Sequence, residues 1–332
     1  MSIGSESKRV QRATLIYNPL AGPSNWAGPI ELVADYWRAR RWDVTIRPTR
    51  VPGHATTLAA EAAAAGHALV IAAGGDGTLG EVANGLAGTE VVLAPLPAGT
   101  GNSFAKELHI LRAGRFGAFR LLDATEALVA GRVQRIDLGR TLVDGQPGPY
   151  WLLWAGAGAD GYLVQQMEPR PKWSKKLGTL GYILQALTLF PQMPPMKVSV
   201  TVDGRRYDDH CLLVVVTNCR RYAGGLLELN PQGLLDDGRF EVWMFRGQGV
   251  KETAHHFLQV KLGRHLADDR IVMVSGREVR VETDPVLPCQ SDGDDAGTTP
   301  LHCVVEPLAL RVLIPATAPV DIFALPGEAF PL

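Results

Sequence analysis

Residues 71–86, IAAGGDGTLGEVANGL, carry the clearest chemical signal in the sequence. An apolar run that ends at Ala73 predicts a buried strand, Gly74 to Thr78 predict a tight loop, and apolar residues at helical spacing follow. This order directs backbone N–H groups at a helix N-terminus, where the partial positive charge favours a phosphate. Asp76 would repel a triphosphate unless a magnesium ion lay between them, so we expect Asp76 to act on a nucleotide's metal or hydroxyl groups. Thr78 is expected to contact phosphate or to cap the helix, and the alternative is an ordinary strand-to-helix turn.

Similar loops follow neighbouring predicted strands. The strand at 14–17 leads into a turn-rich segment that begins at Asn18, and the strand at 91–96 leads into the glycine-containing loop 98–102 and a short helix. Alternating strands and helices predict a mostly parallel sheet, which binds ligands beyond the carboxyl ends of its strands. We expect these loops to lie together at that edge.

Composition limits the class of protein. The 332 residues suit two domains or one large one, and a hydrophobic fraction of 46% suits a substantial core. A net charge of −1 gives no overall field for a nucleic-acid partner. The four cysteines form no CxxC pair and indicate reduced, mostly buried thiols in a cytoplasmic protein. No apolar signal region begins the sequence and no stretch nears the ~18 apolar residues of a transmembrane helix, so we expect any membrane contact to be peripheral.

The pattern of the sequence changes near residue 135. Strands alternate with helices before this point, whereas short β-rich runs separated by Asp-Gly and Gly-Pro turns follow it. We therefore expect an α/β domain at 10–135, a β-rich domain at 136–315, and a C-terminal segment at 316–332 that could return to the first domain. A helical insertion is expected at 175–190.

A set of ordered motifs resembles one known family over nearly the whole chain. The motifs are YNPLAG, GGDGTLGEVANGL, LPAGTGNSFAKEL, RIDLGR, WAGAGADGYLV, KKLGTLGYILQAL, TNCRRYAGG, LLDDGRFEVWMF and SDGDD. In this order they are similar to the diacylglycerol/sphingosine lipid kinase family, and most to its soluble bacterial diacylglycerol-kinase-like members. GGDGT alone is less specific, because NAD kinases share it. The resemblance implies an N-terminal α/β nucleotide-binding domain with a mostly parallel sheet and a C-terminal β-sandwich domain, with the active site in the cleft between them.

The resemblance also implies which residues bind the cofactors ATP and Mg²⁺. The residues expected at ATP lie in loops of the first domain: Asn18, Thr49, Gly74, Gly75, Asp76, Gly77, Thr78 and Thr100. Asp237 matches an aspartate associated with a structural magnesium ion, with main-chain oxygens near Leu234 and Arg239 as its co-ligands. An ordinary Asp-Gly hairpin is the alternative at Asp237.

Asp294, in SDGDD, is the general base that the resemblance implies, and Asp76 is the second expected catalytic residue. A carboxylate within hydrogen-bond reach can accept the proton of a lipid hydroxyl that attacks the γ-phosphorus, while magnesium neutralises the phosphates. The family usually has glutamate here. Aspartate is one methylene shorter, and a displacement of about 1 Å can cost on the order of 10²-fold in rate unless the backbone compensates. Asp295 is the alternative base, and a solvated acidic turn is the structural alternative.

Two other patterns predict no site. The GxGxxG match at 156–161 lacks the βαβ frame and the acidic residue of a dinucleotide fingerprint. His255 and His256 are adjacent, so they cannot chelate a metal from one helix face, and we expect them on a solvated face.

The expected activity is that of an ATP-dependent lipid kinase that phosphorylates the hydroxyl of a diacylglycerol-like or sphingoid lipid. A basic segment with Lys172, Lys175 and Lys176 precedes apolar residues 180–190, which predicts either a peripheral contact at the inner membrane surface or a core helix with a solvated end. No nucleic-acid partner is expected, and the resemblance allows a homodimer. An NAD kinase-like enzyme with a soluble substrate is the first alternative. A catalytically weak lipid- or nucleotide-binding protein, suggested by Asp294, is the second.

Overall fold

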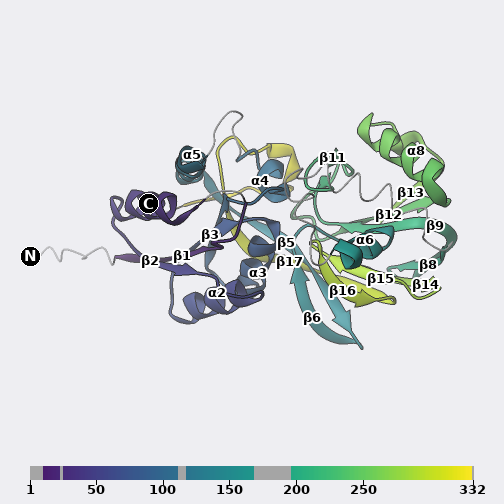
Figure 1. Ribbon diagram of the computed structural model, residues 1–332, viewed down its shortest axis with the longest axis horizontal. Coiled ribbons are helices and arrows are strands. Elements are labelled where there is room, and N and C mark those ends of the chain that lie inside the picture. Colours follow the sequence, from purple (N-terminus) through teal and green to yellow (C-terminus); the bar gives the residue numbers. More distant parts are fainter. Residues whose placement is uncertain (1–9, 23–24, 111–116, 168–195, 331–332) are drawn as a thin grey trace, which may run out of the picture.

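The computed structural model describes residues 10–22, 25–110, 117–167 and 196–330. In these ranges an α/β unit and a β-rich unit lie side by side, and long strands pass between them (Figure 1). The helical insertion predicted at 175–190, which includes Lys175 and Lys176, and Lys172 before it lie outside the described residues. None of the helices in the described ranges has the length and apolar character needed to cross a membrane.

The α/β unit alternates strands with helices, as the sequence predicts. Its elements are β1 (Gln11–Tyr17), α1 (Ala27–Arg38), β2 (Trp42–Pro48), α2 (His54–Ala64), β3 (Leu69–Gly74), α3 (Asp76–Leu86), β4 (Val92–Pro97), α4 (Ser103–Glu107) and α5 (Gly117–Val129). The strands run parallel in the order β2-β1-β3-β4, with α1 and α5 packed together on one face and α2 and α3 on the other (Figure 1). Strands β3 and β4 are buried along their whole length because helices cover both faces of the sheet.

The β-rich unit is mainly antiparallel. Its elements are β5 (Arg132–Val143), β6 (Gln146–Trp151), β7 (Trp154–Gly158), α6 (Ala159–Met167), β8 (Met196–Val202), β9 (Arg205–Thr217), β10 (Arg221–Tyr222), β11 (Leu227–Glu228), β12 (Phe240–Arg246), α8 (Gly249–Lys261), the 3-10 turn η2 (His265–Ala267), β13 (Ile271–Gly276), β14 (Glu278–Asp284), β15 (Pro288–Ser291), β16 (Asp294–Thr298), β17 (Leu301–Ile314), the 3-10 turn η3 (Val320–Ile322) and β18 (Glu328–Ala329). Alternate residues of its strands enclose a second hydrophobic core, in which Trp151 stacks on Phe240 with ring centroids 4.8 Å apart.

Two strands join the units into one sheet. Strand β17 pairs with β14 of the β-rich unit and, farther along, runs parallel to β4 of the α/β unit. Strand β5 lies antiparallel to β17 over most of its length, so the sequence change near residue 135 falls inside a strand. The chain then returns to the α/β unit, where Phe330 stacks on Trp42 with centroids 5.7 Å apart.

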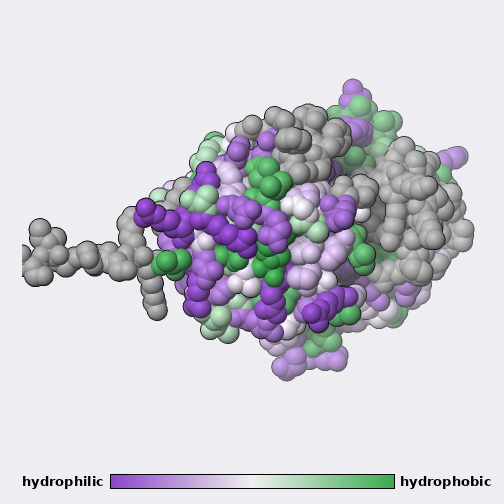
Figure 2. Space-filling view, turned by 60° about the vertical axis from the view of Figure 1, so that its left-hand side comes forward, coloured by the Kyte–Doolittle hydropathy of each residue, from purple (hydrophilic) through white to green (hydrophobic). Residues whose placement is uncertain are grey.

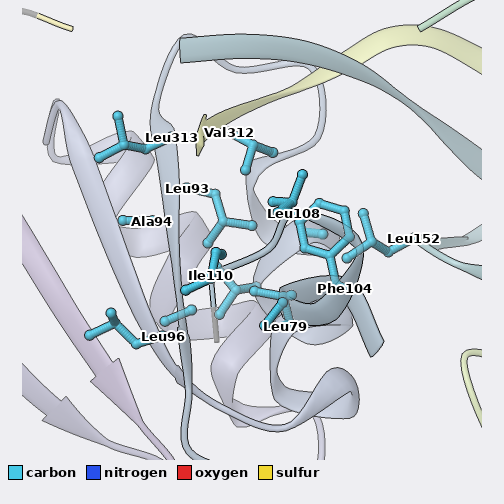
Figure 3. Close-up of a cluster of buried hydrophobic side chains, with 14 of the residues drawn as sticks. Leu79, Leu93, Ala94, Leu96, Phe104, Leu108, Ile110, Leu152, Val312 and Leu313 are labelled. Atoms are coloured by element: carbon cyan, nitrogen blue, oxygen red, sulfur yellow. The ribbon is translucent and has the colours of Figure 1, made fainter. Parts of the chain in front are cut away.

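The core at the junction draws on both units. Leu79 of α3, Phe104 of α4 and Val312 of β17 belong to one buried cluster with Leu152, which lies between β6 and β7 and next to Phe104 (Figure 3). All four side chains are buried, with Leu79 the most exposed at 7%. Outside this core, hydrophilic residues cover much of the face on which the α/β unit comes forward, with hydrophobic residues in smaller groups (Figure 2). The packing at the junction fixes α3 and α4 against the β-rich unit.

Candidate active site

The expected nucleotide loops meet at the carboxyl edge of the parallel strands. Asn18 follows β1, and its Nδ2 donates a hydrogen bond to Oγ1 of Thr78 at 3.4 Å. Thr49 follows β2, and its backbone N–H donates to the carbonyl of Tyr17 at 2.8 Å. Thr100 is exposed in the loop after β4. The structure therefore brings together the loops that the sequence predicts, as the edge of a parallel sheet requires.

The N-terminus of α3 is open to a ligand. Gly75 precedes the helix, and no side chain of the described residues caps it. The N–H of Leu79 donates to the carbonyl of Gly75, so the N–H groups of Asp76, Gly77 and Thr78 have no acceptor within the helix. N–H donors without an acceptor in their own helix, added to the helix dipole, favour a phosphate at this position.

The two glycine loops touch through their backbones. A Cβ atom on Gly99 would lie 2.4 Å from Cα of Gly75, so a side chain at residue 99 would push the loops apart. Residues of β3, β4, α3 and α4 line a small hollow beside the loops, with room for about 10 Å³. That is about the space of one water molecule, so a nucleotide would not fit in it and would lie on the outer side of the loops.

The carboxylate of Asp76 is turned toward the second loop. Its Oδ2 accepts the N–H of Ser103 at 2.9 Å, and its Oδ1 accepts the N–H of Phe104 at 3.2 Å. Burial raises the pKa of Asp76, whereas these two N–H groups lower it. Asp76 thus caps α4, a partner that the sequence did not reveal, and its role toward the metal or hydroxyl groups of a nucleotide stays a prediction.

A second buried carboxylate, that of Asp292, lies close to Asp76. Asp292 and Gly293 have φ angles of 50° and 89° and form the tight turn between β15 and β16. The Asp292 side chain reaches back and accepts the backbone N–H groups of Leu152, Leu153 and Trp154 at 2.6, 2.7 and 3.2 Å. Burial first, and then the charge of Asp76, raise its pKa to about 7.

The position of Asp292 against α3 depends on the small residue at position 80. A Cβ on Gly80 would lie only 3.2 Å from Oδ2 of Asp292. Asp76 and Asp292 are two neighbouring carboxylates beside the nucleotide loops, and both already accept backbone N–H groups. A divalent cation could be held here only by the lone pairs that these bonds leave. The SDGDD motif contains Asp292, but the sequence analysis assigned this residue no role. Its Asp-Gly turn was the feature of the sequence that could have drawn attention to it.

Asp294 and Asp295 open strand β16 and are exposed. Asp294 pairs with Ser291 across the hairpin, and Asp295 pairs with Gln290. Their expected role as general base stays a prediction, because it depends on where a bound lipid hydroxyl lies.

A buried polar cluster lies beside this hairpin. Oδ2 of Asp160, the second residue of α6, accepts a hydrogen bond from Nε2 of Gln290 at 2.5 Å, and Tyr222 also hydrogen-bonds this carboxylate. Burial raises the pKa of Asp160 to about 6. The GxGxxG segment joins β7 to α6 here, but the neighbours of β7 are antiparallel, so no βαβ frame surrounds it.

Helix α4 connects the nucleotide loops to the β-rich unit. The carboxylate of Asp76 accepts an N–H group of the first turn of α4. Glu107, at the end of α4, is 3% exposed. The carboxylate of Glu107 accepts the backbone N–H groups of Arg220 and Arg221 at 3.1 and 3.0 Å, and Nζ of Lys106 donates to the carbonyl of Gly224 at 2.6 Å. These contacts fix the loop around residue 220 relative to the GGDGT loop.

The predicted magnesium site at Asp237 lies in a group of acidic residues. Oδ1 of Asp237 accepts the N–H of Arg239 at 3.0 Å. Burial raises the pKa of Asp237, and burial together with the charge of Asp237 raises that of Glu241 to about 7. This negative charge suits a cation, and the carboxylate of neighbouring Asp236 accepts the N–H groups of residues 324 and 325. The ligand set with Leu234 and Arg239 stays a prediction.

The expectation that His255 and His256 form a solvated face is wrong for His256, which is 4% exposed. Its Nε2 lies 2.8 Å from the carbonyl of Arg246, because adjacent residues on a helix point in different directions and this one faces the sheet. His255 contacts Asp268, and a ligand atom of each of the three residues lies within 4.8 Å of the others. The guanidinium of Arg270 already lies 2.7 Å from Nε2 of His255, so a positive charge is present there.

Comparison with known proteins agrees with this arrangement. The family model described as "Diacylglycerol kinase catalytic domain" matches residues 12–141, and that described as "YegS C-terminal NAD kinase beta sandwich-like domain" matches residues 155–314. A diacylglycerol kinase of Bacillus subtilis strain 168 is 30% identical over 293 residues, which cover 88% of this chain and 92% of the relative. The chain belongs to the diacylglycerol kinase family.

Other members of the diacylglycerol kinase family extend the comparison. A diacylglycerol kinase of Staphylococcus aureus strain MRSA252 is 26% identical over 295 residues, which cover 88% of this chain and 89% of the relative. A crystal structure of a candidate diacylglycerol kinase from Bacillus anthracis strain Sterne covers 93% of this chain and 99% of its own, with a TM-score of 0.73 and 25% identity. Family membership confirms the predicted fold class, an α/β domain followed by a β-sandwich-like domain, and supports kinase activity of this class.

Proposed function

We propose that this protein is an ATP-dependent lipid kinase that transfers the γ-phosphoryl group of ATP to the hydroxyl of a diacylglycerol-like or sphingoid lipid. The observation that carries the proposal is the open N-terminus of α3, whose first three N–H groups have no acceptor within the helix and which lies where the two glycine loops meet. A nucleotide triphosphate matches these donors in charge and chemistry.

The carboxylates beside the loops supply the rest of the chemistry. Asp76 and Asp292 would hold the Mg²⁺ of the nucleotide, which neutralises phosphate charge when it is bound. Asp294, or Asp295 next to it, would accept the proton of the lipid hydroxyl from its position on the hairpin of the β-rich unit. The hairpin and the nucleotide loops belong to different units, so the reacting groups would meet where the units join. Because a lipid alcohol lies in a membrane, we expect the enzyme to act at a membrane surface. A homodimer stays a prediction.

An NAD kinase-like activity is the second candidate, because the matched β-sandwich model is itself described as NAD kinase-like. The experiment is transfer of label from [γ-³²P]ATP into a panel of lipid alcohols in mixed micelles, with NAD as the soluble acceptor. We expect labelled lipid from the wild type, loss of product in Asp76→Ala and Asp294→Ala, and full activity in the matched surface variant Asp208→Ala.

Thermal unfolding of Asp76→Ala is measured alongside, because this residue also caps α4. Retained activity in Asp294→Ala, together with loss of activity in Asp295→Ala, would assign the role of general base to Asp295. Labelled NAD without labelled lipid would establish the second candidate. Nucleotide binding without any labelled product would support the catalytically weak binding protein.

A further inference from the structure

Glycines of the GAGADG segment, residues 156–161, allow helix α6 to lie directly on the hairpin of β15 and β16. A Cβ on Gly161 would lie 2.1 Å from the carbonyl oxygen of Pro288, so no side chain fits between α6 and β15 at this point. A Cβ on Gly156 would lie 2.9 Å from Oδ2 of Asp160. Helix α6 contacts both strands of the hairpin, as Figure 1 shows. The segment that lacks the frame of a dinucleotide site therefore has a packing role beside this hairpin.

The packing of α6 places Asp160 against a buried amide of the hairpin. Asp160 is 7% exposed and Gln290 is 0% exposed. Nε2 of Gln290 donates to Oδ2 of Asp160 at 2.5 Å, and Oε1 of Gln290 accepts the N–H of Gly293 at 2.9 Å. Because an ionised carboxylate can only accept hydrogen bonds, Asp160 fixes which end of the amide faces it and leaves the amide oxygen for Gly293. Both ends of the Gln290 side chain are therefore used.

Gly293 belongs to the tight turn that immediately precedes Asp294. The side chain of Gln290 holds the N–H of Gly293, and the N–H of Asp292 donates to the carbonyl of Trp154 at 2.9 Å. The turn is thus held both from its own strand β15 and from β7. Because Asp294 is the next residue of the chain, its position depends on these bonds.

Asp160 is also linked to the nucleotide side of the site. The hydroxyl of Tyr222, on β10, hydrogen-bonds the Asp160 carboxylate. Tyr222 follows Arg221, whose N–H donates to the carboxylate of Glu107 on α4 at 3.0 Å. The rings of Trp154 and Tyr222 pack edge to face with centroids 5.4 Å apart. One buried carboxylate thus bonds both the hairpin and the loop that is fixed to α4.

We propose that Asp160 and Gln290 are positioning residues, which hold the turn at 292–293, and with it Asp294, where phosphoryl transfer requires the general base. A base must lie within hydrogen-bond reach of the hydroxyl that it deprotonates, and a displacement of about 1 Å can cost on the order of 10²-fold in rate. The proposal rests on the proposed function, because it takes the base to follow this turn.

The test exchanges the two polar groups. Gln290→Glu sets a second carboxylate against Asp160, and the like charges repel each other. Asp160→Asn/Gln290→Glu restores a donor and an acceptor, because the introduced amide can donate to the introduced carboxylate. Phosphorylation of a diacylglycerol in mixed micelles is measured at pH 7.5. We expect kcat to fall about 10²-fold in Gln290→Glu with the KM for ATP unchanged, and the double variant to recover most of this loss.

A matched control separates positioning from stability. Val281→Ala removes two methyl groups from a fully buried position of the second core, on β14, which pairs with β8 and β17. It should lower the midpoint of thermal unfolding and keep the wild-type kcat. Hydrogen–deuterium exchange of the peptide at 288–296, read by mass spectrometry, measures the turn itself. Exchange should be faster in Gln290→Glu than in the wild type and slow again in the double variant.

A wild-type kcat in Gln290→Glu would overturn the proposal, as would a loss of kcat that Asp160→Asn does not relieve. If Gln290→Glu does not fold, Gly156→Ala replaces it, since its Cβ would lie 2.9 Å from Oδ2 of Asp160 and 3.3 Å from Nε2 of Gln290, and an unchanged kcat there overturns the proposal.

The exchange measurement keeps the two proposals apart. Absence of lipid product from the wild type would refute the kinase, and exchange at 288–296 would then decide the positioning role by itself. Restored protection in the double variant would support the pair as the element that holds the turn. Equal exchange in the wild type, Gln290→Glu and the double variant would refute the positioning role whatever the activity.

Discussion

Replacing Glu107 by alanine should loosen the joint between the two units. The Glu107 carboxylate is buried, and it accepts two backbone N–H groups of a loop more than 110 residues away in sequence. Removal of the side chain beyond Cβ leaves the N–H groups of Arg220 and Arg221 without this acceptor.

The size of the effect follows from these two bonds. A hydrogen bond to a charged group contributes about 1.5–3 kcal/mol, so two of them contribute roughly 3–6 kcal/mol. Burial raises the pKa of Glu107, because the ionised carboxylate is unfavourable in a buried position. Removal of the carboxylate relieves this unfavourable burial, which offsets part of the free energy lost with the two hydrogen bonds. We therefore expect the free energy of unfolding to fall by about 2–4 kcal/mol.

The assay is urea unfolding of the full chain at pH 7.5, followed by circular dichroism. Glu61→Ala is the matched control, because Glu61 contacts Arg47 at 2.9 Å on the surface with half of its side chain exposed. That exposed pair should contribute less than about 1 kcal/mol. A Glu107→Ala protein whose unfolding free energy lies within about 0.5 kcal/mol of the wild type, the range of ordinary surface substitutions, would refute the reasoning.

Two further predictions concern the nucleotide site. The pKa of Asp292 is raised from 3.8 to about 7, so between these values the folded state keeps a proton that the unfolded state has lost. The contribution of this carboxyl to stability is therefore greatest below pH 3.8 and is lost as pH rises through about 7. Between pH 5.5 and 8, the free energy of unfolding should fall more steeply in the wild type than in Asp292→Asn. Parallel pH profiles would contradict this. Gly99→Ala places a Cβ 2.4 Å from Cα of Gly75 and should cost about 10²-fold in turnover, whereas Gly28→Ala, with no atom within 4 Å of the new Cβ, should leave turnover unchanged. Equal turnover in the two alanine variants would show that the loops need not touch.

The local part of the fold could be predicted from the sequence. Ile30, Val33, Ala34 and Trp37 are spaced as one face of a helix, and all four are buried in α1. The strand, loop and helix around GGDGT were predictable for the same reason, since neighbouring residues determine the periodicity and the turn.

The buried acids could not be assigned in this way. Asp76 binds N–H groups 27 and 28 residues away, and Glu107 binds groups 113 and 114 residues away. Which distant backbone group a carboxylate caps depends on the packing of whole elements and leaves no local pattern. His256 was misplaced for a related reason, because only the packing of α8 on β12 shows which helix face is covered.

The central claim, that the open α3 N-terminus serves transfer of the terminal phosphate of ATP to a lipid alcohol, has a direct test. The wild type is incubated with diacylglycerol in mixed micelles and either [γ-³²P]ATP or [α-³²P]ATP, and the lipid is extracted and counted. We predict label in the lipid from the γ-labelled nucleotide and background counts from the α-labelled one. Background counts from both, with diacylglycerol and every other lipid alcohol of the panel, would contradict the claim.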